Sequence, residues 1–238
     1  MRVIFVKLRW MGVVATFSIA AIVLNLLTLQ HLELDRLESA DMTKLQGKVI
    51  MIDAGHGGID DGASGNGIIE KELNLTIALK LRDTLVGYGA QVVMIRDTDV
   101  DFYTKGKGGK RNDLMKRVEM INTSGADLFL SIHADSIKAA VRPGAQVLYG
   151  VRNEESKKLA EALQLALKDC PPGNKRPAKE DKVIIVLNDS TIPGVLVETG
   201  FLSEKAEAAN LRNPIYQDKM AQRLAKGLAY HFTYNVGL

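Results

Sequence analysis

The stretch that decides the fold is Val49-Ile50-Met51-Ile52-Asp53-Ala54-Gly55-His56-Gly57-Gly58. An apolar run that ends in glycines predicts a buried strand that stops abruptly. Glycine lets the backbone turn tightly and approach a ligand closely. We therefore expect His56 at a strand end, facing the crevice where ligands bind in open α/β sheets. A tight turn whose histidine only bonds the backbone is the alternative.

Two further apolar runs end in residues that can bind metal. Leu128–Ile132 leads into His133, and Val195–Val197 leads into Glu198, while Glu70 opens a segment that looks helical. Three protein ligands with an open fourth position are typical of a catalytic zinc site, and two histidines with one glutamate are a common set. The remaining carboxylate could be the general base for water on the metal. Spacing alone leaves open which glutamate is the ligand.

The chain has only 4 histidines, which narrows the choice. His31 lies beside the N-terminal apolar segment and His231 lies near the C-terminus, so His56 and His133 are the natural pair. A lone histidine at a strand end is more often structural. Two of them, each with small neighbours and with carboxylates available, favour a metal site.

Other charged residues near these segments have two interpretations each. Asp53 and Asp135 could orient the ligand histidines, or they could make capping and turn hydrogen bonds. Arg96 and Arg117 could bind a substrate carboxylate or hold loops by ion pairs, and we favour the structural role.

At these residues the chain resembles the zinc-dependent N-acetylmuramoyl-L-alanine amidases, which cut peptidoglycan between the lactyl group and L-alanine. The similarity covers about Lys48 to Phe232, and the matching segments are residues 53–58, 70–71, 96–97, 117–118, 131–134 and 197–203. The resemblance implies that His56, Glu70 and His133 bind Zn²⁺ and that Glu198 is the catalytic carboxylate. Asp135 is a departure, because most members have asparagine there, and it would add negative charge near the metal.

A narrower similarity is to the germination-specific members of the family in endospore-forming bacteria. It rests on the insert at residues 105–111 and on the ending at residues 216–221. Those members carry an N-terminal hydrophobic segment and strip peptides from muramic acid in the spore cortex, so that a deacetylase can then help to form muramic-δ-lactam. The resemblance implies a peptidoglycan substrate and a deacetylase or other partner protein acting in sequence. The alternatives are an inactive peptidoglycan-binding or scaffolding protein on the same fold, which the presence of all four site residues argues against, and a zinc peptidase.

Composition bounds the remaining possibilities. A chain of 238 residues with 46% hydrophobic residues suits one domain plus a short appendage. The net charge of +3, with no basic stripe interleaved with aromatics, argues against nucleic acid as a partner. The single cysteine, Cys170, excludes an intrachain disulfide. We interpret it as a spare thiol in the approach to a loop.

The N-terminus is separate from the fold. Basic residues precede a charge-free run from Trp10 to Leu29, which matches the roughly 20 residues that cross a bilayer as a helix. The flanking positive charges predict a cytoplasmic N-terminus and an exported body. A cleaved signal peptide is the alternative, but its apolar core is usually about 7–15 residues long. We therefore favour an uncleaved membrane anchor.

The body alternates between strands and helices, which predicts a single α/β domain with a twisted, mostly parallel or mixed sheet flanked by helices. We expect residues 1–29 to be the signal or anchor, 30–46 a polar linker and 47–238 the catalytic domain. The expected strands are Val49–Ile52, Gln91–Ile95, Asp127–Ile132, Ala145–Tyr149, Val183–Leu187 and Val195–Val197. The expected helices lie near Lys71–Val86, Asn112–Thr123, Asn153–Lys168 and Asn213–Phe232, with exposed loops over residues 101–110 and 171–182.

Overall fold

The structure, a computed structural model, describes residues 2–103, 108–136 and 142–234. The chain divides into two compact units, Met1–Ser39 and Ala40–Leu238. The first contains helix α1 (Arg2–Glu38). Among the described residues, one helical stretch, Val13–Glu38, is long and apolar enough to cross a membrane, a criterion that signal sequences also meet.

The second unit is built on a six-stranded sheet with the order β4-β1-β5-β8-β6-β7. Its strands are β1 (Val49–Ala54), β4 (Gln91–Met94), β5 (Leu128–Asp135), β6 (Gln146–Gly150), β7 (Lys179–Asp181) and β8 (Gly194–Phe201). Strands β4, β1, β5 and β8 are parallel, whereas β6 runs antiparallel to β8. A small hairpin of β2 (Ser64–Gly65) and β3 (Ile68–Ile69) precedes the first helix of this unit. The expected mostly parallel, mixed sheet is confirmed.

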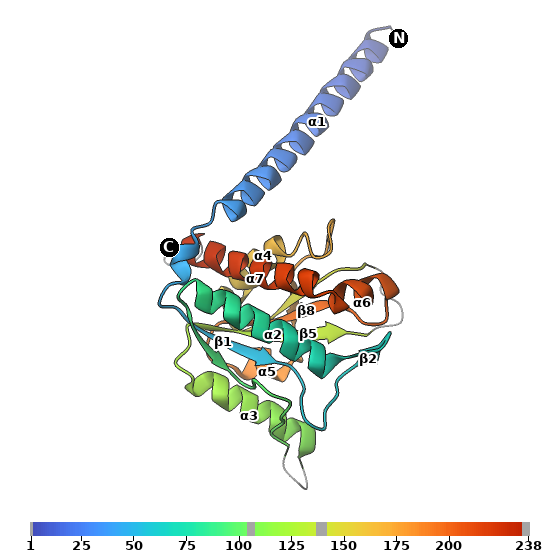
Figure 1. Cartoon of the computed structure of the whole chain (residues 1–238). Helices are drawn as coiled ribbons and strands as arrows, with labels where there is room; N and C mark the ends of the chain where they lie inside the picture. The colour runs from blue at the N-terminus through green and yellow to red at the C-terminus, as the bar shows by residue number, and fades with distance from the viewer. Residues whose placement is uncertain (1, 104–107, 137–141, 235–238) are drawn as a thin grey trace. The chain divides into compact units, whose positions relative to one another are not determined.

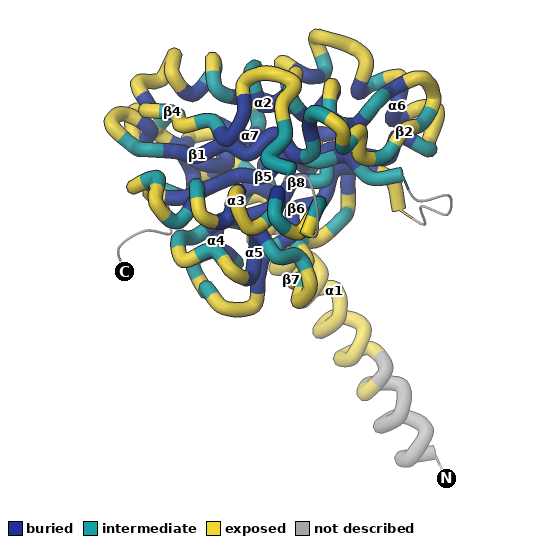
Figure 2. The backbone as a smooth tube through the Cα atoms, turned by 90° about the horizontal axis from the view of Figure 1, so that it is seen from below, coloured by how far each residue is buried: buried dark blue, intermediate teal, exposed yellow. Residues whose placement is uncertain are grey.

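Helices cover both faces of this sheet, as Figure 1 shows. They are α2 (Glu70–Gly87), α3 (Gly109–Thr123), α4 (Glu154–Ala166), α5 (Ile185–Asp189), α6 (Lys205–Arg212) and α7 (Pro214–Tyr234), with a 3₁₀ turn at Met42–Leu45. Helices α2, α4 and α7 pack on one face around a large apolar core, and α3 and α5 pack on the other. The central strands are buried on both faces (Figure 2), because alternate residues of each strand point into the two cores.

The register of the parallel strands fixes where the polar residues meet. Asp53 of β1 lies opposite Ser131 of β5, and His133 of β5 lies opposite Glu198 of β8. The carboxyl ends of β1, β5 and β8 therefore meet at one edge of the sheet, where open α/β sheets bind their ligands.

The prediction of a strand at Val183–Leu187 is wrong, because its last three residues belong to the short helix α5 and its first two precede that helix. The carboxylate of Asp181 accepts hydrogen bonds from the backbone N–H of Val183 and of Ile184, at 2.8 and 2.9 Å, and turns the chain before the helix. A short apolar run does not distinguish a buried helix from a strand. Strand β7 lies inside the loop expected over residues 171–182, and α6 was not predicted.

Two other expectations concern the linker before the folded unit and the single cysteine, Cys170. The expected linker, residues 30–46, overlaps the folded unit, because Leu45 is fully buried and Lys226 Nζ donates to the backbone oxygen of Ala40 at 3.2 Å. Cys170 lies in the turn that leads from α4 into the loop at residues 171–178, as expected, and its side chain is fully buried in the larger apolar core. Residues 104–107 of the expected glycine- and lysine-rich loop lie outside the described residues.

His231 makes the stability of the fold depend on pH. Its side chain is 3% exposed, and its Nδ1 has no hydrogen-bond partner among the described residues. Burial lowers the pKa of this imidazole to about 4, whereas the unfolded value is about 6.5. The preference of the folded chain for neutral His231 is therefore without cost to stability above about pH 6.5. As the pH falls from there toward 4, the unfolded chain binds a proton that folded His231 does not, and the free energy of unfolding decreases.

We predict that His231→Leu weakens the acid sensitivity of the fold. The free energy of unfolding of the unmodified chain should fall by up to about 1.4 kcal/mol per pH unit from this group alone. Urea denaturation between about pH 7 and pH 5 measures the slope. His31→Gln, at an exposed position in α1, is the matched control and should keep the original slope. Equal slopes for the chain and for His231→Leu would refute the role of His231.

Candidate functional site

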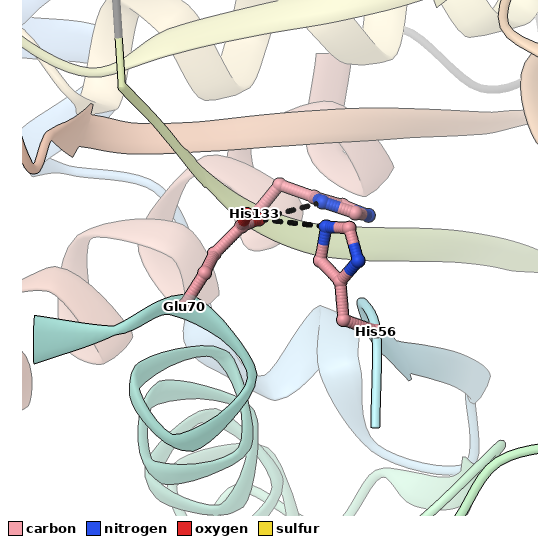
Figure 3. A group of neighbouring side chains, drawn as sticks. All are labelled: His56, Glu70 and His133. Carbon is pink, nitrogen blue, oxygen red and sulfur yellow. Dashed lines mark hydrogen bonds and ion pairs between the residues drawn. The ribbon is translucent and has the colours of Figure 1, made fainter. Parts of the chain in front are cut away.

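Three of the predicted residues form a cluster at the carboxyl edge of the sheet (Figure 3). His56 follows β1, Glu70 is the first residue of α2, and His133 lies in β5. Glu70 Oε1 lies 3.1 Å from His56 Nε2 and 3.0 Å from His133 Nδ1. One potential ligand atom from each residue lies within 4.8 Å of the others, so the cluster could hold a metal ion.

The loop that carries His56 has an unusual backbone. His56 has φ +62°, in the left-handed region that few residues other than glycine adopt. Arg117 Nη2 donates to the backbone oxygen of His56 at 2.7 Å. The carboxylates of Asp99 and Asp101 accept from the N–H of Gly58 and Ile59, both at 2.8 Å. Tertiary contacts therefore hold the turn that points His56 into the cluster.

Glu70 is a buried and fully engaged carboxylate. It receives hydrogen bonds from the backbone N–H of Ala63 at 2.7 Å and of Ala134 at 3.2 Å, and from Asn74 Nδ2 at 3.1 Å. Burial alone would raise the pKa of Glu70, but the hydrogen bonds and charges of His133 and His56 hold it far below its usual range. Glu70 therefore stays ionised, as a metal ligand must be.

The carboxylate of Glu198 differs from that of Glu70 in its hydrogen bonding and in its pKa. It lies in β8 beside His133, but outside the three-residue cluster. Its Oε2 is buried without a hydrogen-bond partner among the described residues. Burial raises the pKa of Glu198 to about 7, and the charges of Glu70 and Asp135 act in the same direction against those of His133 and Arg176. A buried carboxyl that titrates near neutrality is suited to general acid–base chemistry.

Asp53 and Asp135 do not bond the clustered histidines. Asp53 forms a buried ion pair with Arg117 and accepts from Ser131 Oγ at 2.7 Å. Although burial opposes it, the charge of Arg117 lowers the pKa of Asp53. Asp135 accepts from the backbone N–H of Ser136 at 2.6 Å, which is a local turn bond. The extra negative charge of Asp135 acts on Glu198 instead.

Both arginines have the structural role that we favoured. Arg117 also pairs with Asp113 of its own helix, at 2.8 Å, and is 2% exposed. Arg96 is equally buried and donates to backbone oxygens of Ala54 at 2.7 Å, Gly55 at 2.9 Å and Lys71 at 2.8 Å. These bonds tie the end of β1 to the start of α2, and thus set the spacing between His56 and Glu70.

Sequence reasoning missed two features of the site. Asp60 lies 2.8 Å from His56 Nδ1, and nothing in its spacing distinguished it from the neighbouring aspartates. Asn74 follows Glu70 by one helical turn, a spacing that a helical interpretation could have found.

A cavity of about 270 Å³ opens beside the cluster between Lys110 and the apolar segment 183–186.

Comparisons with known proteins identify the family to which this chain is similar. The family described as N-acetylmuramoyl-L-alanine amidase matches residues 50–230. The germination-specific N-acetylmuramoyl-L-alanine amidase of Bacillus subtilis (strain 168) is 40% identical over 193 residues, 79% of this chain and 81% of that protein. The CwlD amidase from Clostridioides difficile, solved in complex with the GerS lipoprotein, is 34% identical with a TM-score of 0.75 and covers 79% of this chain and 100% of that one. An N-acetylmuramoyl-L-alanine amidase structure from Clostridium difficile 630 is 30% identical with a TM-score of 0.70 and covers 80% and 99%.

Gly55 supplies the space for the ring of His133. A Cβ atom at position 55 would lie 2.2 Å from His133 Nε2, far inside van der Waals contact. We predict that Gly55→Ala displaces this ring, abolishes metal uptake by the cluster and destabilises the fold by about 1–3 kcal/mol, as overpacking does. Metal analysis and urea denaturation measure both effects. Gly87→Ala, where a Cβ meets nothing within 4 Å, is the control, and equal behaviour of the two variants would contradict the prediction.

Proposed function

This chain belongs to the N-acetylmuramoyl-L-alanine amidase family and is a cell-wall amidase that hydrolyses peptidoglycan, and from that premise we propose that it works with one zinc ion held by His56, Glu70 and His133. The observation that carries the proposal is the convergence of two imidazole nitrogens and one ionised carboxylate on a single point. This donor set fits zinc, because catalytic zinc sites use three such ligands and keep a fourth position open.

Zinc bound there would polarise the amide carbonyl and lower the pKa of a water molecule. Glu198 would accept a proton from the attacking water and deliver it to the leaving amine. Its pKa of about 7 suits a group that must both take up and release a proton at neutral pH. Its buried Oε2 has no partner within the described part of the chain, which leaves it available for that exchange. Glu70 remains ionised and, in this proposal, serves only as a ligand.

The substrate is proposed to be the peptidoglycan of the spore cortex. Similarity to the germination-specific amidase of B. subtilis supports this assignment. Cleavage would separate the lactyl group of muramic acid from L-alanine and leave a free lactyl carboxylate. A deacetylase that frees the neighbouring sugar nitrogen could then act in sequence, so that the two groups close to muramic-δ-lactam. The GerS complex of the C. difficile amidase supports the idea that a partner protein also binds this chain.

Metal binding and proton transfer can be tested separately by mutation. We predict that His133→Ala loses zinc and activity together. Glu198→Gln should retain about one zinc per chain but turn over roughly 10²–10⁴-fold more slowly, because it keeps the shape of the site and loses the proton-transfer group. Digestion of purified peptidoglycan, with and without chelator, followed by mass spectrometry of the products, measures both effects and identifies the bond that is cut.

Three results would contradict this assignment. Full zinc content in the double variant His56→Ala with His133→Ala would exclude the proposed metal site. Near-normal activity of zinc-loaded Glu198→Gln would move the proton-transfer role to another group, with Glu70 as the first to test. Products cut at a peptide bond would indicate a peptidase instead of an amidase.

We also propose that α1 anchors an exported catalytic unit to the cytoplasmic membrane. A truncated chain that begins at Ala40, where the compact unit begins, should be soluble and should hydrolyse muramoyl-peptides at the rate of the full chain in detergent. Membrane fractionation of the full chain, with the truncated chain as control, tests the anchor. A truncated chain that folds and binds zinc but stays inactive would show that α1 or a membrane partner contributes to catalysis.

A further inference from the structure

We propose that Asp60 is a positioning residue, which fixes the imidazole of His56 and thereby sets the affinity of the site for zinc. This inference rests on the proposed zinc site. Asp60 Oδ2 lies 2.8 Å from His56 Nδ1, while Nε2 of the same ring faces Glu70 Oε1 at 3.1 Å. The two nitrogens of one ring thus face an orienting carboxylate on one side and the ligand cluster on the other.

The hydrogen bond to Asp60 determines which ring nitrogen is available to the metal. With zinc in the cluster, Nε2 would give its lone pair to the metal, and the ring would keep its proton on Nδ1, where the Asp60 carboxylate accepts it. A carboxylate behind a ligand histidine fixes the tautomer and the orientation of the ring, and it makes the other nitrogen a stronger ligand.

Asp60 is itself held in place. Its backbone N–H and carbonyl exchange two hydrogen bonds with Gly57, both at 3.0 Å, and its Oδ1 accepts from the N–H of Gly62 at 3.3 Å. Lys110 Nζ lies 3.2 Å from Oδ2 and balances the charge from the first turn of α3. The side chain is 17% exposed, so the bond to His56 is partly shielded from water. These contacts leave Oδ2 directed at the ring with little rotational freedom.

His133 is positioned by a different device. Its Nδ1 faces Glu70, and its Nε2 side packs against Gly55, where the missing Cβ makes room for the ring. His133 is therefore fixed by packing and His56 by a hydrogen bond. Removal of the Asp60 carboxylate should affect His56 and leave the His133 side of the cluster intact.

The test compares zinc affinity in Asp60 variants with that of a neighbour. Asp60→Ala should bind zinc about 10–100-fold more weakly than the unmodified full chain, measured by competition with a chromophoric chelator. Asp60→Asn should fall between the two, because its amide oxygen can still accept the Nδ1 proton without the charge. Asp61→Ala is the matched control, since the Asp61 side chain is 63% exposed and pairs with Lys71 instead of His56. This control should bind zinc as the unmodified chain does.

A spectroscopic readout separates positioning from general damage. In the zinc-loaded chain, the Nδ1 proton of His56 should give an exchange-protected imidazole signal in ¹⁵N-correlated NMR spectra. The signal should vanish in Asp60→Ala and persist in Asp61→Ala, while the melting temperatures of the two metal-free variants stay similar.

Zinc affinities for Asp60→Ala and Asp60→Asn that equal those of the unmodified chain would overturn the inference and leave the metal site standing. Zinc binding that is unaffected by His56→Ala would overturn the proposed site and the role of Asp60 with it. Equal losses of affinity in the Asp60 and Asp61 variants would also refute the inference, because they would indicate a general charge effect.

Discussion

The buried ion pairs of Arg117 with Asp53 and Asp113 are the constraint on which the site depends. They join the end of β1 to α3, and the same guanidinium donates to the backbone of His56. Loss of one partner from such a network leaves an uncompensated buried charge, which typically costs about 3–5 kcal/mol. Without this network, the left-handed turn that directs His56 would lose its support. Arg96 repeats the arrangement on the α2 side through backbone oxygens. The ion pairs of Arg117 therefore help to define the geometry of the cluster.

Much of this arrangement could be predicted from the sequence, because the ends of apolar runs mark the positions at which buried strands end. Apolar runs that end in His56, His133 and Glu198 are strands, and parallel strands bring their carboxyl ends to one edge. The apolar pattern predicted the wrong element where a short run has neither a helical nor a strand period. Val183–Leu187 is as apolar as a strand, but Asp181 turns the backbone into α5. The link between Asp60 and His56 also escaped prediction, because it depends on the path of a glycine-rich turn and not on residue spacing. The division of labour between the two glutamates likewise follows from their environments, which spacing cannot provide.

The environments of Glu70 and Glu198 differ although both are buried glutamates near the same histidines. Glu70 receives hydrogen bonds from backbone, amide and imidazole donors, which stabilise its charge. Glu198 lies in β8, opposite His133, and its Oε2 has no hydrogen-bond partner among the described residues. Burial raises the pKa of Glu198, and the negative charges of Glu70 and Asp135 act in the same direction. Two identical side chains with pKa values driven in opposite directions are typical of sites where one group binds and the other transfers a proton. The assignment of roles that we propose rests on this contrast.

The burial of the single thiol has a consequence for how the chain would respond to oxidants. Cys170 is fully enclosed in the core beneath α4 and α7, and burial raises its pKa to about 11. Thiolate, the form that reacts with oxidants and disulfides, is therefore both scarce and inaccessible while the domain is closed. An oxidising environment could link two copies through this residue only during an opening of the core. Disulfide-linked dimers would thus form only from molecules whose core has opened. Their rate of formation would depend on the opening equilibrium of the domain and not on its exposed residues.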